Sequence, residues 1–389
     1  MMNEMPHAGD VDRLVVQQYD VSAVTIGGID TCIRGLLNYA PQGIGIVVVG
    51  VDESNSRQRL GIWERHQRGG RVIWFLPVAR IHMHGKGRIP NSVRMVAGLL
   101  RYRRSIPRPK TVQAHRVDVG IFARLLFRGP LVYCIHTQER GLLGPTSDSW
   151  WRFTGNLHER LDRMMVRVAE RVIVFNPAYA EKVRRWNPRT ISAPTWFDPA
   201  ITRPVTEAVD PFAVVWVGRL EIPKDPQLAV RAFAHLALEN PDEPWTLEII
   251  GSGALRPVLE QQIAALPATV AERITLRGRL APPEVAAARE RSGVFLMTSH
   301  AGYEGFPRVL VEAMATGLPA VVTEGSDTGG LVQQGVSGFV RDRDPGALAD
   351  AIRDARGLER VKVLEAVADL SAPRVVRNVF FSDEQGRVS

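Results

Sequence analysis

The sequence predicts an α/β protein made of two doubly wound, Rossmann-like lobes. Three observations support this prediction. Short β-branched runs alternate with helix-length segments along the chain, a rhythm typical of parallel strands joined by crossover helices. The runs are almost continuously apolar, which indicates sheets covered on both faces. At 389 residues, the chain exceeds one ordinary core and suits two.

The expected strands fall into two groups. The first group comprises residues 44–51, 71–75, 111–115, 131–136 and 171–175. The second comprises residues 212–218, 246–251, 273–278, 293–298 and 318–323. Prolines and the lack of periodicity predict a linker over residues 197–211. We therefore expect a first domain over residues 11–200, a second over 211–365, and a segment over 366–389 that crosses back to the first. Two such lobes facing across a cleft would bring the carboxyl ends of both sheets to one ligand site.

The composition is that of a soluble globular protein, with 45% hydrophobic and 23% charged residues. No stretch approaches the roughly 18 to 20 apolar residues that span a bilayer, and the opening residues are too polar for a secretory signal. We expect a cytoplasmic protein. Cys32 and Cys134 stand far apart without metal-ligand spacing, which predicts two reduced, buried thiols and no metal site.

Positive charge is concentrated in the first half of the chain. Between Arg57 and Arg128 there are 17 Lys or Arg residues, against only two acids. Such an excess attracts anionic partners, such as lipid headgroups, pyrophosphate-linked acceptors or nucleic acid, although a solvated basic face without a partner is the alternative. Nucleic acid is disfavoured because the stretch lacks interleaved aromatics suited to base stacking.

Residues 91–104 of this basic stretch have the pattern of an amphipathic helix. Arg94, Arg101 and Arg104 fall on one face, and apolar side chains fall on the other. Such a helix can lie on the inner face of an anionic membrane as a peripheral anchor. An ordinary Rossmann helix with its apolar face on the sheet is the favoured alternative.

Two loops of the second lobe carry residues suited to a nucleotide ligand. Arg219 and Lys224 follow a strand that ends at Gly218, so that both charges can be aimed at one anion, although two loop cations are also commonplace. Gly251 and Gly253 follow the next strand and precede a helix. Glycines there let a base, ribose or phosphate approach the backbone, and a tight turn without a ligand explains them equally well.

The segment from Glu304 to Glu312 is more specific. Glu304 stands in a glycine-rich loop, and Glu312 lies eight residues on, within a helix expected to start near Phe306. Eight steps of about 100° place the two carboxylates on nearly the same azimuth. The N–H groups of Gly305 and Phe306 open the helix and can receive a phosphate, while the acids accept hydrogen bonds from sugar hydroxyls. The structural alternatives are an ion pair between Glu312 and Arg308, and a helix-capping role for Glu304.

The run EGFPRVLVEAMATGLPAVVT, together with VGRLEIPKD, resembles the nucleotide-binding lobe of the family-four retaining glycosyltransferases of the GT-B fold. The signature of that family is a Glu, seven residues, Glu pattern preceded by a Gly-Arg-Leu loop with a lysine. Both parts stand here in the expected order and at the expected separation. The resemblance covers about residues 20–365 and is strongest over 212–355. It implies an acceptor-side first domain and a second domain that binds a nucleotide sugar.

The resemblance also implies roles for the site residues of the second lobe. Arg219 and Lys224 would hold the donor diphosphate, with Gly305 and Phe306 as backbone donors. Glu312 would bind the ribose hydroxyls, beside Gly251 and Gly253 at the nucleotide. Glu304 would hold the transferred sugar as a catalytic residue.

In the first lobe, the pair Gly27-Gly28 resembles the glycine loop under the diphosphate, and His136 matches the catalytic histidine near the sugar. A histidine satisfied within the core is the alternative for His136. Three departures leave the sugar and acceptor open, namely residues 193–198 in place of Pro-Asn-Gly-Val-Asp, Asn176 in place of serine, and no acid after the glycine pair in residues 326–331.

The resemblance implies a metal-independent, retaining hexosyltransferase without a cofactor. The donor would be a UDP- or GDP-sugar, and the acceptor a glycan or lipid-linked molecule used in cell-surface polysaccharide or glycolipid synthesis. Fixed cations would stabilise the departing diphosphate in place of a metal. The alternative is a nucleotide-sugar-binding regulatory or partner subunit without transfer activity. The retention of Arg219, Lys224, Glu304 and Glu312 argues against this alternative.

Overall fold

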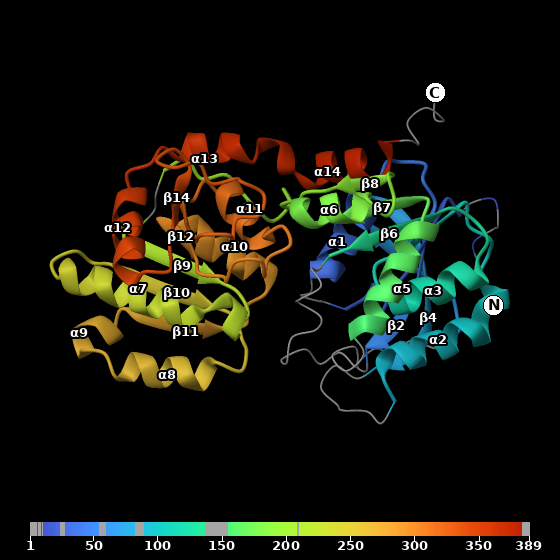
Figure 1. Cartoon of the computed structure of the whole chain (residues 1–389), viewed down its shortest axis with the longest axis horizontal. Coiled ribbons are helices and arrows are strands. Elements are labelled where there is room, and N and C mark those ends of the chain that lie inside the picture. The colour runs from blue at the N-terminus through green and yellow to red at the C-terminus, as the bar shows by residue number, and fades with distance from the viewer. Residues whose placement is uncertain are drawn as a thin grey trace. The chain divides into compact units, whose positions relative to one another are not determined.

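The structure is a computed structural model that describes residues 6, 9, 11–23, 28–53, 60–81, 89–136, 155–207 and 210–382. Gly27, and residues 57–59 and 82–88 of the basic stretch, lie outside the described residues. The chain divides into two compact units, one formed by residues 1–193 and 376–389 and the other by residues 194–375. Figure 1 shows the elements of both units.

The first unit contains an eight-stranded sheet in the order β3-β4-β2-β1-β5-β6-β7-β8. Seven strands are parallel neighbours: β1 (Arg13–Val16), β2 (Ile46–Glu53), β4 (Arg71–Ile81), β5 (Thr111–Ala114), β6 (Leu131–Ile135), β7 (Arg171–Val174) and β8 (Thr190–Ser192). The edge strand β3 (Glu64–Arg68) pairs antiparallel with β4.

The five strands expected in this unit are present and parallel, as expected, and the sheet has one additional antiparallel strand at its edge. β1, β3 and β8 were not predicted. β3 has the sequence ERHQR, whose polar side chains suit an edge with one wet side. β8 has three residues, too few to show a pattern. β1 has the apolar sequence RLVV and was missed although β7, a strand of the same length, was predicted.

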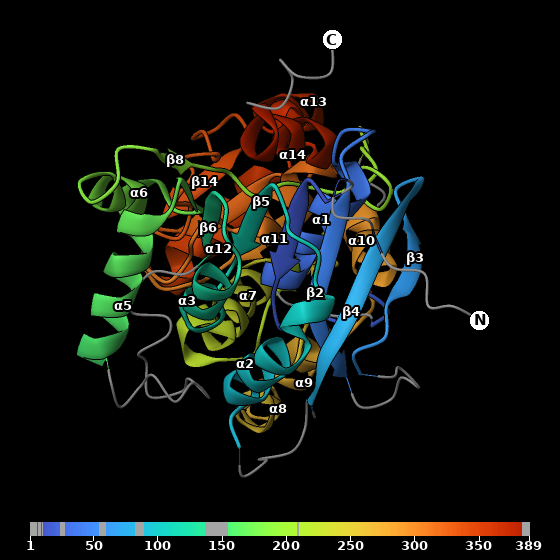
Figure 2. The same ribbon diagram turned by 90° about the vertical axis from the view of Figure 1, so that its right-hand side faces the viewer.

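Helices cover this sheet: α1 (Gly28–Tyr39), α2 (Asn91–Tyr102), α3 (Val117–Leu126), α5 (Gly155–Val168) and α6 (Pro177–Arg184). α2, α3 and α5 lie side by side (Figure 2). α2 buries Met95 and Leu99, and a Cβ at Gly98 would lie 2.1 Å from the Val78 carbonyl oxygen, so glycine permits close packing on β4. The favoured interpretation of this helix as an ordinary sheet-packing helix is therefore confirmed for its inner face.

The second unit contains a six-stranded parallel sheet in the order β11-β10-β9-β12-β13-β14. Its strands are β9 (Ala213–Val217), β10 (Thr246–Ile250), β11 (Ile274–Gly278), β12 (Val294–Met297), β13 (Ala320–Thr323) and β14 (Gly338–Arg341). The five expected strands are confirmed, and β14 was missed. The helices of this unit are α7 (Pro226–Glu239), α8 (Arg256–Ala264), α9 (Ala268–Ala271), α10 (Pro282–Arg291), α11 (Arg308–Ala315), α12 (Pro345–Ala355) and α13 (Arg360–Ala366). The last helix, α14 (Ala372–Phe380), continues from this unit into the first, with the boundary between Val375 and Val376.

Both faces of this second sheet are buried, as its apolar strands predict. Val214 and Trp216 of β9 belong to one apolar cluster, which includes side chains of α7 and α12. Val215 of the same strand belongs to another cluster, which includes side chains of α11. Alternate side chains of a strand point to opposite faces, so one strand contributes to both clusters.

The stretch 197–211, expected to be a linker, lies within the second unit. Phe197 forms an isolated bridge with Ser371, and the Val205 amide donates to the Thr316 carbonyl oxygen at 2.9 Å. These backbone contacts attach the stretch to the second unit. Because they involve no helix or regular strand, the sequence shows no periodicity that could predict them. The chain passes between the units at Ala193 and Pro194 instead.

Among the described residues, no helix combines the length and the apolar character that a membrane span requires.

Candidate functional site

The candidate donor site lies where the strand order of the second sheet reverses. β9 is flanked by β10 on one side and β12 on the other, and the chain continues outward from both. Loops that follow such a pair of strands diverge at their carboxyl ends and leave room for a ligand. The loop after β9 carries Arg219 and Lys224, and the loop after β12 carries Glu304.

Hydrogen bonds hold these two loops together. The His300 amide donates to the Pro223 carbonyl oxygen at 2.8 Å, and the Thr298 hydroxyl lies 2.7 Å from the Asp225 carbonyl oxygen. The indole N–H of Trp216 donates to the same hydroxyl at 2.9 Å. Because each loop is anchored to the other, the side chains on both have a defined separation.

Lys224 and Glu304 form an ion pair, with 2.5 Å between Lys224 Nζ and Glu304 Oε1. The Ser299 hydroxyl donates to the same carboxylate oxygen at 2.5 Å. The side chains of Lys224 and Glu304 are 14% and 9% exposed, so the pair is largely removed from water. The structure thus brings together two residues that the sequence placed in separate motifs. Glu304 accepts these bonds, and Pro307 occupies the N-cap position of the helix that follows, which corrects the capping alternative for Glu304.

Arg219 lies at the rim of the same loop with a side chain that is 64% exposed. Its guanidinium donates to the Tyr303 hydroxyl, and to Glu221 Oε1 at 3.1 Å. Burial raises the pKa of Tyr303 above its usual value, so the phenol stays protonated at neutral pH. Tyr303 and Glu221 orient an exposed cation without removing it from solvent.

Glu312 is held by Arg289 of α10 at 2.6 Å, not by Arg308 as the sequence alternative proposed. The Arg308 guanidinium instead donates to the Trp196 carbonyl oxygen at 3.5 Å and lies over the Trp196 ring. The side chain of Arg289 is 2% exposed and that of Glu312 is 22% exposed. A buried cation therefore anchors a carboxylate that reaches solvent.

The helix that carries Glu312 begins at Arg308, two residues after Phe306, with Pro307 as its N-cap. Glu304 therefore precedes the helix, and the argument that both carboxylates share a helical azimuth was wrong. Proline in the loop sets this later start, since the residue before it is biased away from helical geometry. Gly305 and Phe306 belong to the loop, where the Thr328 hydroxyl donates to the Gly305 carbonyl oxygen.

Gly251 and Gly253 have a packing role in the structure. Gly251 has φ +151°, and a Cβ there would lie 1.8 Å from the Gly218 carbonyl oxygen. A Cβ at Gly253 would lie 2.4 Å from the Leu220 carbonyl oxygen. Both glycines let the loop after β10 approach the loop that carries Arg219. This packing accounts for both residues, and a nucleotide contact at either stays a prediction.

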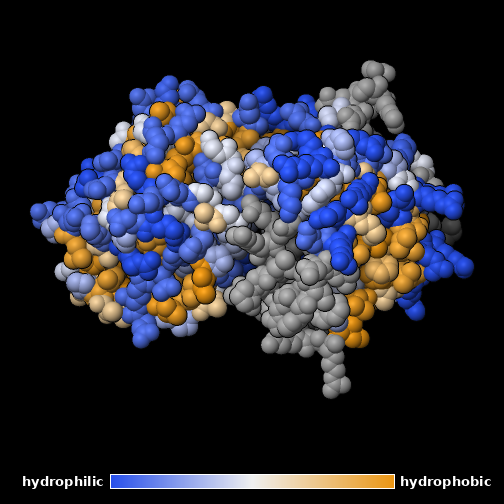
Figure 3. Space-filling model, viewed as in Figure 1, coloured by the Kyte–Doolittle hydropathy of each residue, from blue (hydrophilic) through white to orange (hydrophobic). Residues whose placement is uncertain are grey.

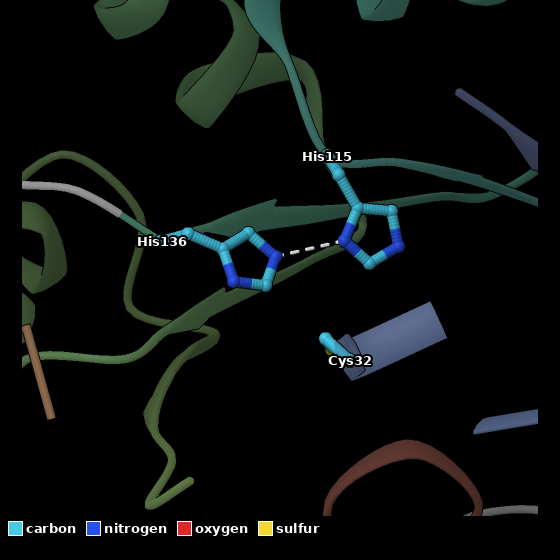
Figure 4. A group of neighbouring side chains, drawn as sticks. All are labelled: Cys32, His115 and His136. Atoms are coloured by element: carbon cyan, nitrogen blue, oxygen red, sulfur yellow. Dashed lines mark hydrogen bonds between the residues drawn. The ribbon is translucent and has the colours of Figure 1, made fainter. Parts of the chain in front are cut away.

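The candidate residues of the first unit are Gly28 and His136. Gly28 is the first residue of α1, and a Cβ there would meet nothing within 4 Å. His136 directly follows β6 and is half-buried. Its Nε2 lies 2.8 Å from Nδ1 of His115, which follows the neighbouring strand β5 (Figure 4).

Cys32 and Cys134 are buried in the first unit, and burial raises the pKa of the Cys134 thiol. The structure also shows a cluster that sequence spacing did not reveal. Potential ligand atoms of Cys32, His115 and His136 lie within 4.8 Å of one another. The facing nitrogens of the two histidines are hydrogen-bonded to each other, and the absence of a metal stays a prediction.

Sequence reasoning missed four residues that organise these sites. They are His115, Arg289, Ser299 and Arg343. Arg343 donates to the carbonyl oxygens of Thr298 and Ser299 at 2.9 and 3.1 Å, and also pairs with Asp225. Of these four residues, only His115 could have been found from the sequence, because it ends an expected strand, as His136 does.

Comparison with known proteins defines the class to which this fold and site belong. A family model described as "Glycosyl transferases group 1" matches residues 211–356. A D-inositol 3-phosphate glycosyltransferase from an Arthrobacter species is 31% identical over 72% of this chain and 68% of its own length. The chain belongs to the group 1 glycosyltransferases.

This chain is also similar to other glycosyltransferase sequences and to solved structures. A D-inositol 3-phosphate glycosyltransferase of Paenarthrobacter aurescens is 27% identical, over 60% of this chain and 60% of its own length. Sucrose-phosphate synthase from Thermosynechococcus elongatus shares the fold with a TM-score of 0.73 at 18% identity, over 96% of this chain and 98% of that one. Anabaena HepE in complex with UDP-glucose has a TM-score of 0.69 at 18% identity, over 96% and 99%. These likenesses identify the two Rossmann-like units as the GT-B fold.

Proposed function

We propose that the protein is a retaining glycosyltransferase that moves a hexose-type sugar from a UDP- or GDP-sugar to an acceptor hydroxyl. The observation that carries this proposal is the Lys224–Glu304 pair at the strand-order reversal of the second sheet. Membership of the family and the UDP-glucose named in the HepE complex support a nucleotide-sugar donor. No metal takes part in the proposed reaction.

The diphosphate leaving group gains negative charge as the bond to the anomeric carbon breaks. Fixed cations aimed at that charge lower the barrier because they need no reorganisation at the moment of reaction. Lys224 can supply this charge while it keeps Glu304, because an ammonium group has three N–H donors and the ion pair uses one. Arg219 is exposed and can turn its planar fork of donors toward phosphate oxygens.

The two acids bind different parts of the donor in this mechanism. Arg289 holds Glu312 through Oε2, and the carboxylate is partly exposed, so it can accept hydrogen bonds from ribose hydroxyls. Glu304 accepts hydrogen bonds from Lys224 and Ser299 through Oε1, and a carboxylate has about four acceptor positions, so it can also accept a sugar hydroxyl. The acceptor hydroxyl attacks from the side on which the diphosphate leaves, which retains the anomeric configuration.

A thermal-shift panel with UDP-, GDP- and ADP-sugars tests donor binding, because a ligand that binds the native state raises the melting temperature by mass action. We expect one nucleotide to stabilise the protein at submillimolar concentration. Release of the nucleoside diphosphate from the same sugar then tests bond cleavage. Binding without release, with any acceptor tried, would favour a nucleotide-sugar-binding subunit without transfer activity. No stabilisation by any nucleotide sugar would contradict the proposal.

For the acceptor, we propose a glycan or a lipid-linked molecule at an anionic membrane surface, used in cell-surface polysaccharide or glycolipid synthesis. Apolar and basic side chains share the outer surface of α2 and α3, where Figure 3 shows apolar atoms gathered. Val93, Leu100 and Leu125 are 53%, 42% and 75% exposed, beside the exposed Arg101 and Arg124. This combination suits the boundary between lipid headgroups and acyl chains.

Vesicle co-sedimentation tests this surface. We expect the protein to bind vesicles that contain an anionic lipid, with binding that falls as salt rises. Replacing Leu100 and Leu125 by Ser should weaken binding without loss of fold, because both side chains are exposed. Replacing the exposed Leu238 of α7 by Ser is the matched control. Equal binding to neutral and anionic vesicles would remove the proposal.

A further inference from the structure

A chain of hydrogen bonds in the first unit leads from a buried arginine to His136. Arg13 NH1 donates to Gln113 Oε1 at 2.9 Å. Gln113 Nε2 lies 2.9 Å from His115 Nε2, and His115 Nδ1 lies 2.8 Å from His136 Nε2. Arg13, Gln113 and His115 are buried, so water does not compete for these groups.

The strand registers explain why these side chains meet. Gln113 and His115 are two residues apart and therefore point to the same face of the sheet. Gln113 pairs with Val132 in β6, which places His136 on that face as well. Cys32 of α1 lies beside the two histidines (Figure 4).

The arginine sets the direction of every bond in the chain. A guanidinium only donates, so the side-chain oxygen of Gln113 must face Arg13 and its NH₂ group must face His115. His115 Nε2 therefore accepts, and a neutral His115 carries its proton on Nδ1. Burial and the charge of Arg13 lower the pKa of His115 to about 3, which keeps the ring neutral at physiological pH.

We propose that His115 is a positioning residue that fixes the tautomer of His136, so that His136 presents Nδ1–H as a hydrogen-bond donor to the transferred sugar. This inference rests on the proposed function. Nε2 of His136 accepts the hydrogen bond that His115 Nδ1–H donates, so the proton of a neutral His136 lies on its own Nδ1. That nitrogen lies on the side of the ring away from His115 (Figure 4).

The ring geometry supports a true hydrogen bond. The planes of His115 and His136 differ by 22°, and their centroids are 5.1 Å apart while the facing nitrogens are 2.8 Å apart. The rings therefore meet edge to edge, with the lone pair of one close to the N–H direction of the other. Phe175 stacks on His136 at 4.6 Å and limits its rotation.

Two residues near the C-terminus, Phe380 and Phe381, hold Arg13, the residue at which the chain of hydrogen bonds begins. Arg13 NH2 donates to the Phe380 carbonyl oxygen at 2.8 Å, and the guanidinium lies 4.3 Å from the centroid of the Phe381 ring. With both ends of the guanidinium engaged, the Gln113 amide has one favourable orientation. The position of the proton on His136 therefore depends on residues that are distant from it in sequence.

Nitrogen-15 NMR of the full chain tests the tautomer directly, because protonated and unprotonated ring nitrogens of a neutral histidine differ in chemical shift. We expect Nδ1 of His136 to be protonated at pH 8.5, with the resonance assigned from its loss in His136→Gln. A proton on Nε2 would overturn the proposal. Stoichiometric zinc in the purified protein would also overturn it, because a metal on these nitrogens replaces their hydrogen bond.

Gln113→Glu should invert the tautomer. A carboxylate accepts from Arg13 and also from His115, which moves the His115 proton to Nε2. His115 Nδ1 then accepts, and His136 must donate from Nε2. The positive charge of Arg13 compensates the new negative charge, so we expect His115 to stay neutral at pH 8.5. Gln261→Glu, the same change on an exposed residue of α8, should leave the His136 spectrum unchanged. An unchanged spectrum in Gln113→Glu would contradict the relay.

Activity supplies a second readout. His115→Leu removes the N–H that faces His136, and we expect kcat for transfer to fall by roughly 10²-fold while the KM for the donor changes little. His115→Asn keeps an N–H close to the position of Nδ1 and should recover much of that loss. Equal loss in both variants would indicate packing alone and overturn the proposal.

The readouts separate the two hypotheses. If nucleotide sugars neither bind nor react but His136 carries its proton on Nδ1, the proposed function fails and the fixed tautomer stands. If transfer occurs and the proton is on Nε2, the relay fails and the proposed function stands.

Discussion

The two candidate sites use opposite kinds of polar group. In the second unit, Lys224 and Glu304 are charged and satisfy each other through a short ion pair. In the first unit, His115 and His136 meet through a hydrogen bond, with burial keeping His115 neutral. Removing charges from water is costly unless they are paired, whereas a neutral ring requires only that its donor and acceptor be satisfied. This difference agrees with our proposal that Lys224 faces the phosphates of the donor and His136 an uncharged sugar hydroxyl.

The largest expected effect comes from Lys224→Met. Loss of the cation should lower transfer by about 10³-fold, because it removes the group assigned to the leaving diphosphate. It also removes the ion-pair partner of the buried Glu304 carboxylate, which should destabilise the protein by about 3 kcal/mol. Steady-state kinetics and urea unfolding measure the two losses.

Lys362→Met is the matched control for that experiment. Lys362 pairs with Glu365 at 3.6 Å, and both side chains are at least half exposed. An exposed pair contributes less than about 1 kcal/mol, so activity and stability should hardly change. Normal transfer by Lys224→Met would contradict the role in transfer that we propose for the charged site.

Glu304→Gln tests the other half of the pair while preserving its shape. We expect transfer to fall by about 10²-fold, because an amide both accepts more weakly and presents N–H groups to Lys224. Kinetics with the donor varied measure kcat and KM separately. Full activity with an unchanged donor KM would contradict both the binding and the catalytic assignment of Glu304.

The neutral histidine site should make the stability of the protein fall in acid. His115 has a folded-state pKa of about 3, below its unfolded value of 6.5, so the unfolded chain binds the proton first as the pH falls. The stability contributed by neutral His115 is complete above pH 6.5 and is lost as the pH falls from 6.5 toward 3. At pH 5 the loss is about 2 kcal/mol.

His115→Asn cannot take up that proton, so it should flatten this part of the pH dependence. Urea unfolding at pH 7.5 and at pH 5, compared with the original protein, measures the difference. The same acid loss in His115→Asn and in the original protein would show that His115 is not held neutral.

The smallest expected effect is at the ribose end of the donor. Arg289→Met removes the cation that holds Glu312, and we expect the donor KM to rise about tenfold, or 1.4 kcal/mol, with little change in kcat. Arg291→Met on the same helix is the control, because Arg291 pairs with Glu248 instead. A larger effect from Arg291→Met than from Arg289→Met would remove Arg289 from the site.

Sequence reasoning recovered the sheet class and singled out Lys224 and Glu304, which the structure brings together, because both strand runs and compact motifs leave local signals. Apolar runs revealed most of the buried strands, but the buried β1, the polar β3 and the short β8 were missed. Arg219, Lys224, Glu304 and Glu312 occur in two compact motifs. Their partners were harder to find. Arg289 lies on another helix, and nothing in its local sequence distinguishes it from the neighbouring arginines.

What the sequence determined by itself was which segments form strands and helices, and which polar side chains follow the strands. Both depend on periodicities of two and about 3.6 residues, which backbone geometry imposes locally. Only the tertiary structure decided that Lys224 meets Glu304, 80 residues away, and that Arg13 meets Gln113, 100 residues away. The charge balance of one site and the proton position in the other depend on these contacts. They form only when strands and loops distant in sequence become neighbours in a sheet.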